Sequence, residues 1–217
     1  MANFNLEVKN AVEALKAGNI ILFPTDTHWS LGCDANNKDA LKKLYTLKQS
    51  YNERNITCFV ADDRMLSKYV KQVPFAAQSI IEVADTPTTI IYDAPQNLAS
   101  NLIAKDNTIA IRIPDDDFCY WLSRKMNGAI VSTSANISGE PTPQSYSAIS
   151  EKIINSVDYV VDLNQDDRSF QTGIGLQPTI GNSDKLCSGK INITVANVKT
   201  ESVRTIRSIQ SKIQKFK

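Results

Sequence analysis

Two clusters of polar residues follow apolar segments of this sequence and contain groups that could do chemistry. Thr25, Asp26 and Thr27 come after the apolar run IILF, and a second cluster, STSAN at 132–136, comes after AIV. Ligands of open α/β sheets collect beyond strand ends, where loop residues approach them. Hydroxyl and backbone N–H groups there can hold phosphate or carboxylate oxygens. The same residue types also form turns and helix caps, so a purely structural role stays open.

Three cations, Lys48, Arg54 and Arg112, are the candidate partners for negative charge on a ligand. Lys48 ends a predicted helix, where a cation also suits the helix dipole. Arg54 lies in a polar segment, where exposure to solvent is the ordinary explanation. Arg112 stands inside the apolar strand segment TIAIRI (108–113), and a buried arginine needs an anionic partner. Arg112 is therefore the strongest single candidate of the three.

The only histidine, His28, lies in the segment PTDTHWSLGCDA (24–35), which we expect to be a loop. A Ser-His-Asp triad would have to use this histidine, and no second feature favours a triad. The sequence also lacks the glycine-rich nucleotide-binding motifs, HExxH and the GxSxG elbow. The plainer interpretation is a loop histidine that packs beside Trp29.

The elements that must position these groups alternate between strand and helix, which predicts an α/β fold. Hydrophobic runs and β-branched residues predict strands at 19–24, 56–61, 88–92, 108–113, 129–134, 158–163 and 191–198. Helical spacing and capping residues predict helices at 6–17, from Asn36 or Asn37 to near Lys48, around 63–72, 75–84, 116–128, 146–157 and 203–216. The first helix would place Leu6, Val12 and Leu15 on one face. We expect one α/β domain over 1–190 and a basic strand-and-helix appendage over 191–217.

Composition narrows the classes of protein further. A chain of 217 residues with 42% hydrophobic and 22% charged residues is typical of one globular domain. It has no apolar run of about 20 residues and no secretory signal at its start, so we expect no membrane contact. The four cysteines form no C-x-x-C pair, which predicts neither disulfides nor a metal site and favours the cytoplasm. From residue 186 onward seven Lys or Arg stand against one acid, which suits either a phosphate backbone or a solvated helix face.

Five segments, in order, resemble the motifs of one family, the YrdC-like (TsaC-like) threonylcarbamoyl-AMP synthases. FPTDTHWSLGCDA is similar to the family's P-T-[DE]-T-x-[YFW]-G-L-G-C-D-A, and LKQS stands at its Lys-x-Arg. TPTTIIY stands at its P-G-P-x-T segment, IAIRIPD at its G-I-R-[IVL]-P-D, and STSANISGEPTP at its S-T-S-A-N-x-S-G. One such motif would be weak evidence, but the ordered series from residue 10 to about 163 is specific.

The resemblance implies a single twisted mixed-sheet domain with helices on both faces and a large concave, positively lined cavity. It also implies condensation of L-threonine, bicarbonate and ATP, with Mg²⁺, into threonylcarbamoyl-AMP and pyrophosphate. The product would serve t6A transferase proteins that modify tRNA, and the family has been described as binding double-stranded RNA. Physically, such an adenylation needs positioning and charge stabilisation rather than a covalent protein nucleophile.

Motif matching implies roles for individual residues. Lys48 and Arg112 would be catalytic. Substrate-binding roles would fall to Thr25, Thr27, Arg54, Ser132, Ser134, Asn136 and Thr179. Thr27 would contact the threonine substrate. The nucleotide, its phosphates and the threonylcarbamate would be held by Lys48, Arg112, Ser132, Ser134 and Asn136.

Five positions depart from the family pattern: His28, Ser30, Ser50, Pro178 and Cys187. His28 and Ser30 replace a small apolar residue and a glycine. In the segment LQPTIGNSDKLCSGKI (176–191), which resembles the family's P-S-T-I…L-R-x-G, Pro178 stands at the serine and Cys187 at the arginine. Ser50 replaces the arginine of Lys-x-Arg, and a serine cannot bind phosphate as an arginine does, although Arg54 could substitute. An active synthase, a catalytically weakened relative that binds nucleotide or double-stranded RNA, and an unrelated α/β enzyme all remain open.

Overall fold

A computed structural model of the 217-residue chain describes residues 2–50, 56–84, 86–163 and 194–197. Its strands are β1 (Ile21–Pro24), β2 (Trp29–Asp34), β3 (Thr57–Phe59), β4 (Thr88–Asp93), β5 (Thr108–Arg112), β6 (Ile130–Ser134), β7 (Tyr159–Val160) and β8 (Thr194–Asn197). Its helices are α1 (Ala2–Lys16), α2 (Lys38–Lys48), α3 (Asp63–Leu66), α4 (Phe75–Val83), α5 (Asp117–Met126), α6 (Glu151–Ile154) and the 3₁₀ turn η2 (Tyr146–Ala148).

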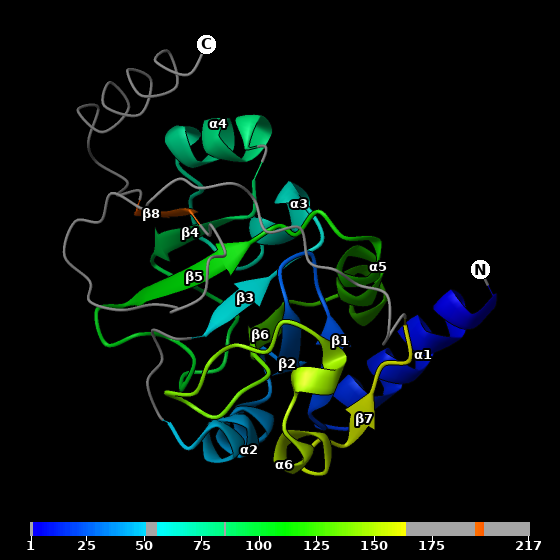
Figure 1. Cartoon of the computed structure of the whole chain (residues 1–217). Helices are drawn as coiled ribbons and strands as arrows, with labels where there is room; N and C mark the ends of the chain where they lie inside the picture. The colour runs from blue at the N-terminus through cyan, green and yellow to red at the C-terminus, as the bar shows by residue number, and fades with distance from the viewer. Residues whose placement is uncertain (1, 51–55, 85, 164–193, 198–217) are drawn as a thin grey trace.

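The described strands form one mixed sheet with helices on both faces, which confirms the predicted α/β class (Figure 1). The strand order is β7-β1-β2-β6-β3-β5-β4-β8. Neighbours from β1 through β2 and β6 to β3 are antiparallel, whereas β3 and β5 are parallel. This order places the end of β1, the start of β2 and the end of β6 together, because Pro24 pairs with Trp29 and Ser30 with Ser134.

Side chains of the sheet alternate between two apolar cores. In β1, Ile21 and Phe23 belong to the core under α1 and α5, whereas Leu22 belongs to the core that contains residues of α2 and α6. Alternate strand residues point to opposite faces, so one short strand contributes to both cores. Phe23 packs against Phe118 of α5, with ring centroids 6.3 Å apart. Apolar packing on both faces of the sheet thus holds the strands, and it thereby positions the polar residues at their ends.

Helix α1 confirms the predicted N-terminal helix, and two of the three residues expected on its apolar face, Val12 and Leu15, are buried. Its buried apolar residues are Val8, Ala11, Val12 and Leu15, at the three- and four-residue steps of one helical stripe. Leu6 is 52% exposed. At about 100° per residue, Leu6 and Leu15 lie on opposite sides of the helix, so the prediction for Leu6 was wrong.

Helix α2 begins and ends where the sequence predicts. The side chain of Asn37 accepts hydrogen bonds from the N–H groups of Asp39 and Ala40, a regular N-cap. Gln49 ends the helix in a left-handed conformation, with φ 54°. The helix therefore stops directly after Lys48, whose side chain is buried.

Three expectations were wrong about which segments are regular. The helix expected around 63–72 is only the short α3, because residues 67–69 form a turn and Val70 bridges to Pro95. The segment 24–35 is not a loop throughout, because β2 occupies its second half and forms a hairpin with β1. The single helix expected at 146–157 is instead η2 and α6. Ile149 and Ser150 have extended backbones between them, and Ile149 is buried. The extended backbone at these two residues buries the Ile149 side chain, and it divides the expected single helix into η2 and α6.

The strand expected at 191–198 is present as β8, which pairs in parallel with β4 at the edge of the sheet. The boundary proposed at residue 190 and the predicted helix 203–216 lie outside the described residues. Within the described part of the chain, no helix is both long and apolar enough to cross a membrane. Cys33, Cys58 and Cys119 are free and buried, and burial raises the pKa of the Cys58 thiol to about 12.

Candidate functional site

The turn between β1 and β2 is organised by the hydroxyl of Thr25. This hydroxyl donates to the carbonyl of His28 at 2.8 Å and accepts from the backbone N–H groups of Thr27 and His28, both at 3.2 Å. The Oγ1 atoms of Thr25 and Thr27 lie 3.1 Å apart, and both residues are buried. The hydroxyl of Thr25 thus fixes the shape of the turn, and Thr27 is held beside it.

Arg112, the last residue of β5, forms an ion pair with Asp26 of this turn. The Nη2 atom of Arg112 lies 2.6 Å from Oδ1 of Asp26, and their side chains are 7% and 11% exposed. The sequence predicted that Arg112 needs an anionic partner, and the structure supplies one. Because Phe59 of β3 pairs with Arg112 in the sheet, the ion pair ties the turn to the middle strands.

Lys48 joins the end of α2 to the segment that follows β6. Its Nζ lies 2.7 Å from the carbonyl oxygen of Ser134 and 2.8 Å from that of Asn136. The Oγ of Ser134 and the Oδ1 of Asn136 lie at 3.4 Å. Lys48 is only 6% exposed, and its carbonyl accepts from the N–H of Ser138 at 3.0 Å. This ammonium therefore sets the backbone path of the predicted STSAN cluster.

The amide of Asn136 turns the chain after β6. Its Nδ2 donates to the carbonyls of Ile137 at 3.0 Å and Glu140 at 2.6 Å. Ser132 is buried within β6, between Gly32 of β2 and Thr57 of β3. Strand pairing thus fixes the backbone of β6, and Lys48 contacts the hydroxyl of Ser134 and the amide oxygen of Asn136 after it.

His28 is partly buried, and the positive charges of Arg112 and Lys48 act on it. Burial, followed by the charges of Arg112 and Lys48, lowers its pKa from 6.5 to about 3, so the imidazole is neutral at pH 7. Its Nδ1 atom is buried without a hydrogen-bond partner among the described residues, as is the hydroxyl of Ser30. Trp29, by contrast, packs on Tyr146 in the core that contains residues of α2 and α6. The imidazole therefore experiences the site's charges, which the loop interpretation did not foresee.

The structure brings most of the predicted site residues together. Two groups are connected by measured contacts: Thr25 and Thr27 in the turn, and Lys48 with Ser134 and Asn136. Arg112 joins the turn through Asp26, and Ser132 lies in the same strand as Ser134. The described residues do not include Arg54, Thr179, Pro178 and Cys187. The roles assigned to all of these residues stay predictions.

Two residues of the site were missed by sequence reasoning. Asp26 was noted only as part of a polar cluster, although a lone acid beside two threonines is a natural partner for a buried arginine. The alternation of apolar and small or polar residues from Trp29 to Asp34 could have revealed β2. With β2 recognised, Ser30 would have been placed opposite Ser134 rather than in a loop.

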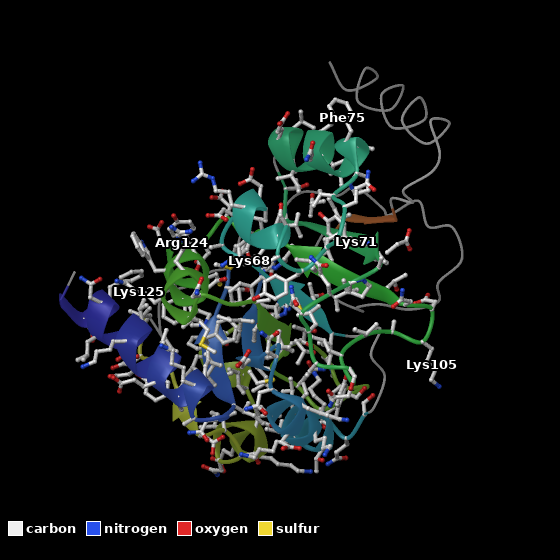
Figure 2. The ribbon with its side chains drawn as sticks, turned by 180° about the vertical axis from the view of Figure 1, so that it is seen from behind. Lys68, Lys71, Phe75, Lys105, Arg124 and Lys125 are labelled. Atoms are coloured by element: carbon white, nitrogen blue, oxygen red, sulfur yellow. The ribbon has the colours of Figure 1, made fainter. Side chains whose placement is uncertain are left out.

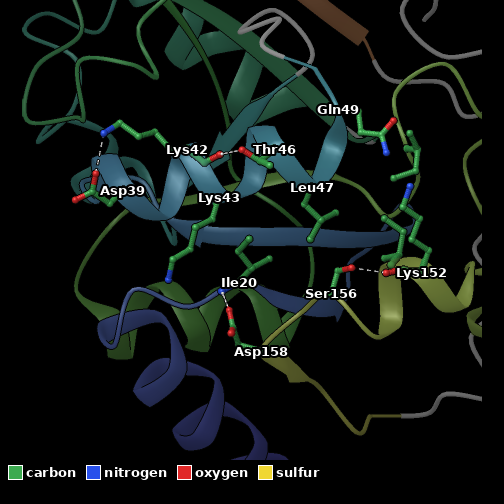
Figure 3. Close-up of a pocket in the computed structure, with 12 residues that line it drawn as sticks. Ile20, Asp39, Lys42, Lys43, Thr46, Leu47, Gln49, Lys152, Ser156 and Asp158 are labelled. Atoms are coloured by element: carbon green, nitrogen blue, oxygen red, sulfur yellow. Dashed lines mark hydrogen bonds and ion pairs between the residues drawn. The ribbon is translucent and has the colours of Figure 1, made fainter.

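An open groove of about 720 Å³ lies elsewhere, between α2 and α6 (Figure 3). Ile20 and Leu47 form part of its apolar wall, and Lys42, Lys43 and Lys152 contribute its cations. It contains none of the predicted site residues. The large concave cavity implied by the resemblance stays a prediction.

Comparison with known proteins identifies the family. The Sua5/YciO/YrdC family, described as "Telomere recombination", matches residues 13–174. The chain belongs to this family. It is 32% identical over 155 residues to the threonylcarbamoyl-AMP synthase of Idiomarina loihiensis, covering 70% of this chain and 83% of that protein. It is 31% identical to the putative threonylcarbamoyl-AMP synthase of Methanocaldococcus jannaschii, covering 73% of this chain and 76% of the relative.

Solved structures of this Sua5/YciO/YrdC family share the fold. E. coli YciO is 26% identical with a TM-score of 0.63, and the match covers 72% of this chain and 77% of that one. P. abyssi Sua5 complexed with L-threonine has a TM-score of 0.66 at 23% identity, and the match covers 70% of this chain and 45% of the Sua5 chain. At that identity the Sua5 likeness supports the arrangement of strands and helices alone.

Proposed function

We propose that this member of the Sua5/YciO/YrdC family is an L-threonylcarbamoyladenylate synthase that supplies tRNA t6A modification. The observation that carries the proposal is the cluster formed by Lys48, Arg112, Ser134 and Asn136 with the Thr25–Thr27 turn. The relatives from Idiomarina and Methanocaldococcus carry this activity in their names. A catalytically weakened relative that only binds nucleotide or RNA is not favoured by these likenesses.

The proposed reaction joins three substrates. The amine of L-threonine attacks bicarbonate carbon to give a carbamate with loss of water. A carbamate oxygen then attacks the α-phosphorus of ATP, and the bond from that phosphorus to the bridging oxygen breaks to release pyrophosphate. Negative charge builds up on the phosphate oxygens as this happens, so positioned cations and N–H donors accelerate the step.

The contacts in the structure assign different tasks to the two cations. Lys48 already holds two backbone carbonyls, so its proposed task is to position Ser134 and Asn136 and to supply positive charge at short range. Arg112 uses one guanidinium nitrogen for Asp26, which leaves its other N–H groups for phosphate or carboxylate oxygens. Thr27, fixed beside Thr25, would bind the threonine substrate.

Mg²⁺ is expected to enter as its ATP complex. Among the described residues, no group of three or more His, Cys, Asp or Glu side chains could hold a metal ion. Phosphate oxygens are the usual ligands that bring Mg²⁺ into such sites. In this proposal the ion offsets phosphate charge, while the chain itself supplies positioning.

Pyrophosphate release tests the activity. Full-length protein is incubated with Mg-ATP, bicarbonate and L-threonine, and pyrophosphate is measured with each substrate omitted in turn. We expect release that requires all three, and folded protein without threonine-dependent release would contradict the proposal. Ser50→Arg restores the family's second cation and should lower the KM for ATP, with the exposed Lys105→Arg as control.

RNA contact is a further part of the proposal, supported by cations that cluster around α3 and α5. Figure 2 shows Lys68, Arg124 and Lys125 on one face, with Lys105 well apart from them. Trp121, 44% exposed, lies 6.0 Å from Nζ of Lys125. Cations interleaved with an exposed aromatic ring suit phosphates and bases. The double variant Arg124→Gln with Lys125→Gln removes two positive charges from this face and should weaken tRNA binding and flatten its salt dependence.

The remaining partners follow from the proposed product. Threonylcarbamoyl-AMP would be consumed by t6A transferase proteins acting on tRNA. The expected compartment is the cytoplasm, because the four cysteines form no paired pattern. Pull-down of a transferase from lysate with the purified chain, followed by product transfer to tRNA, measures this step.

A further inference from the structure

Two atoms at the site, Nδ1 of His28 and Oγ of Ser30, are buried without a hydrogen-bond partner among the described residues. Ser30 is 0% exposed. A buried polar atom without a partner destabilises a folded protein, so natural proteins rarely keep one unless water or a ligand satisfies it. These two atoms belong to residues 28 and 30, at the start of β2, and residues two apart along a strand face the same side. One bound group could therefore satisfy both atoms.

The surroundings of these atoms indicate the charge of that group. Ser30 pairs in the sheet with Ser134, whose hydroxyl lies 3.4 Å from Nζ of Lys48. The charges that lower the pKa of His28 are those of Arg112 and Lys48, both positive. Asp26, the acid in contact with Arg112, is already engaged in the ion pair. An anion is therefore favoured beside His28, and a cation is not.

We propose that His28 and Ser30, together with Arg112, form a subsite for an oxyanion, either a carboxylate or a phosphate group of a substrate. The neutral imidazole would donate through Nδ1–H and Ser30 through its hydroxyl, while Arg112 contributes one of the N–H groups that Asp26 does not use. This inference rests on the proposed function, because it names which groups of that site contact the substrate's negative charge.

The oxyanion could be supplied by either of two substrates. A carboxylate would come from L-threonine or its carbamate, and a phosphate from ATP. Either one places negative charge beside His28 and opposes the effect of Arg112 and Lys48. Bound oxyanion should therefore raise the pKa of His28, whereas a buried water molecule would leave it unchanged.

Because the chain has a single histidine, the pKa of His28 can be measured by NMR without assigning the spectrum to individual residues. In full-length protein labelled with ¹³C,¹⁵N-histidine, His28 gives the only histidine ring signals. The titrations use L-threonine, L-threonine with bicarbonate, and the non-reacting analogue α,β-methylene-ATP with Mg²⁺. We expect at least one to shift the ring signals and raise the pKa, and the effective ligand identifies the source. Ring signals unchanged with all three would overturn the proposal.

Kinetics of two variants give a second readout. His28→Phe keeps a ring but removes both nitrogens, and Ser30→Gly removes the hydroxyl. Loss of one hydrogen bond to a charged group should raise the KM of the matching substrate about tenfold, with a smaller change in the KM of the other. Asn101→Leu is the matched control, because Asn101 Oδ1 is also buried without a partner but Asn101 bonds to Lys38 rather than to the site.

The outcomes separate this inference from the proposed function. Pyrophosphate release by the wild type with unchanged His28 signals and unchanged KM values in both variants overturns the oxyanion subsite and leaves the activity standing. Shifted His28 signals without pyrophosphate release support the subsite and contradict the synthase. If His28→Phe fails to fold, Ser30→Gly and the wild-type titration still decide the question.

Discussion

At the scale of single residues, the neutral state of His28 links the site to folding stability. Burial and the charges of Arg112 and Lys48 lower its folded pKa to about 3, against an unfolded value of 6.5. Between these values the unfolded chain binds more protons than the folded one, so stability falls as the pH drops from 6.5 toward 3. Because one proton is involved, His28 can change the free energy of unfolding by at most about 1.4 kcal/mol per pH unit.

Urea unfolding at a series of pH values from 4 to 7 measures this effect. Carboxylates also titrate in this range, so the comparison is between the wild type and His28→Phe, which share all of them. We expect the free energy of unfolding of the wild type to fall more steeply below pH 6.5 than that of the variant. Parallel curves would show that His28 is not buried beside these charges.

The hydrogen bonds of Lys48 lead to a second prediction for a single residue. Its ammonium satisfies the carbonyls of Ser134 and Asn136, and Lys48→Met leaves both without this donor. Because unsatisfied buried groups cost about 1–3 kcal/mol, we expect the free energy of unfolding to fall by that order. Lys42→Met is the control, since Lys42 is exposed and forms an ion pair with Asp39, also exposed. Equal losses in the two variants would contradict the structural role of Lys48.

Sequence patterns indicated the site's cations but not what each cation contacts. Arg112 was recognisable because a charged side chain inside an apolar strand must be paired. Its partner could not be named, because Asp26 is 86 residues distant and only the folded turn brings the two together. Lys48 seemed suited to a helix dipole, yet its main contacts are carbonyls of a strand end, which no local pattern encodes.

At the scale of elements, β2 depends on a glycine at its centre. A Cβ atom added at Gly32 would lie 2.5 Å from the carbonyl oxygen of Val131 and 2.7 Å from the ring of Phe23. The strand β6 and the core ring both pack directly on this position. Gly32 therefore lets β2 lie between β1 and β6, and so fixes the distance from the turn to the STSAN cluster.

We expect Gly32→Ala to lower the free energy of unfolding by about 1–3 kcal/mol, the usual cost of overpacking. Thermal unfolding followed by circular dichroism measures it. Gly128→Ala is the control, since a Cβ there would meet nothing closer than 3.6 Å, and Gly128 has no positive φ. If Gly32→Ala is as stable as the control, β2 and β6 do not pack as described.

Local patterns predicted most elements, and failures occurred where tertiary contacts decide. The capped helix α2 and the β-branched strands β4 and β5 were predicted because short-range signals suffice for them. Strand β2 was missed because the low β-propensity of Gly32 and Asp34 masked its alternation of apolar residues, and because its pairing with β1 and β6, which no local pattern shows, stabilises it. The break at Ile149 depends on burial of that side chain, which helical spacing does not reveal.

At the scale of the whole molecule, the C-terminal segment is connected to the sheet by β8. Its residues 194–197 pair with β4 over the register from Thr88–Thr194 to Ile91–Asn197. From the sequence we predicted that 191–217 is an appendage, because its basic composition differs from that of the rest of the chain. Composition does not show that part of this segment pairs with β4. The two interpretations differ in what removal of the segment should do.

Two truncations distinguish the interpretations. Ending the chain after residue 190 removes β8 and leaves β4 as an unpaired edge, which lowers stability and invites association of sheet edges. Ending it after residue 199 keeps β8 and removes most of the basic tail. We expect the shorter chain to unfold at lower urea concentration and to associate in light scattering, and the longer one to keep the full-length midpoint. Equal midpoints for all three chains would show that 191–217 is an independent appendage.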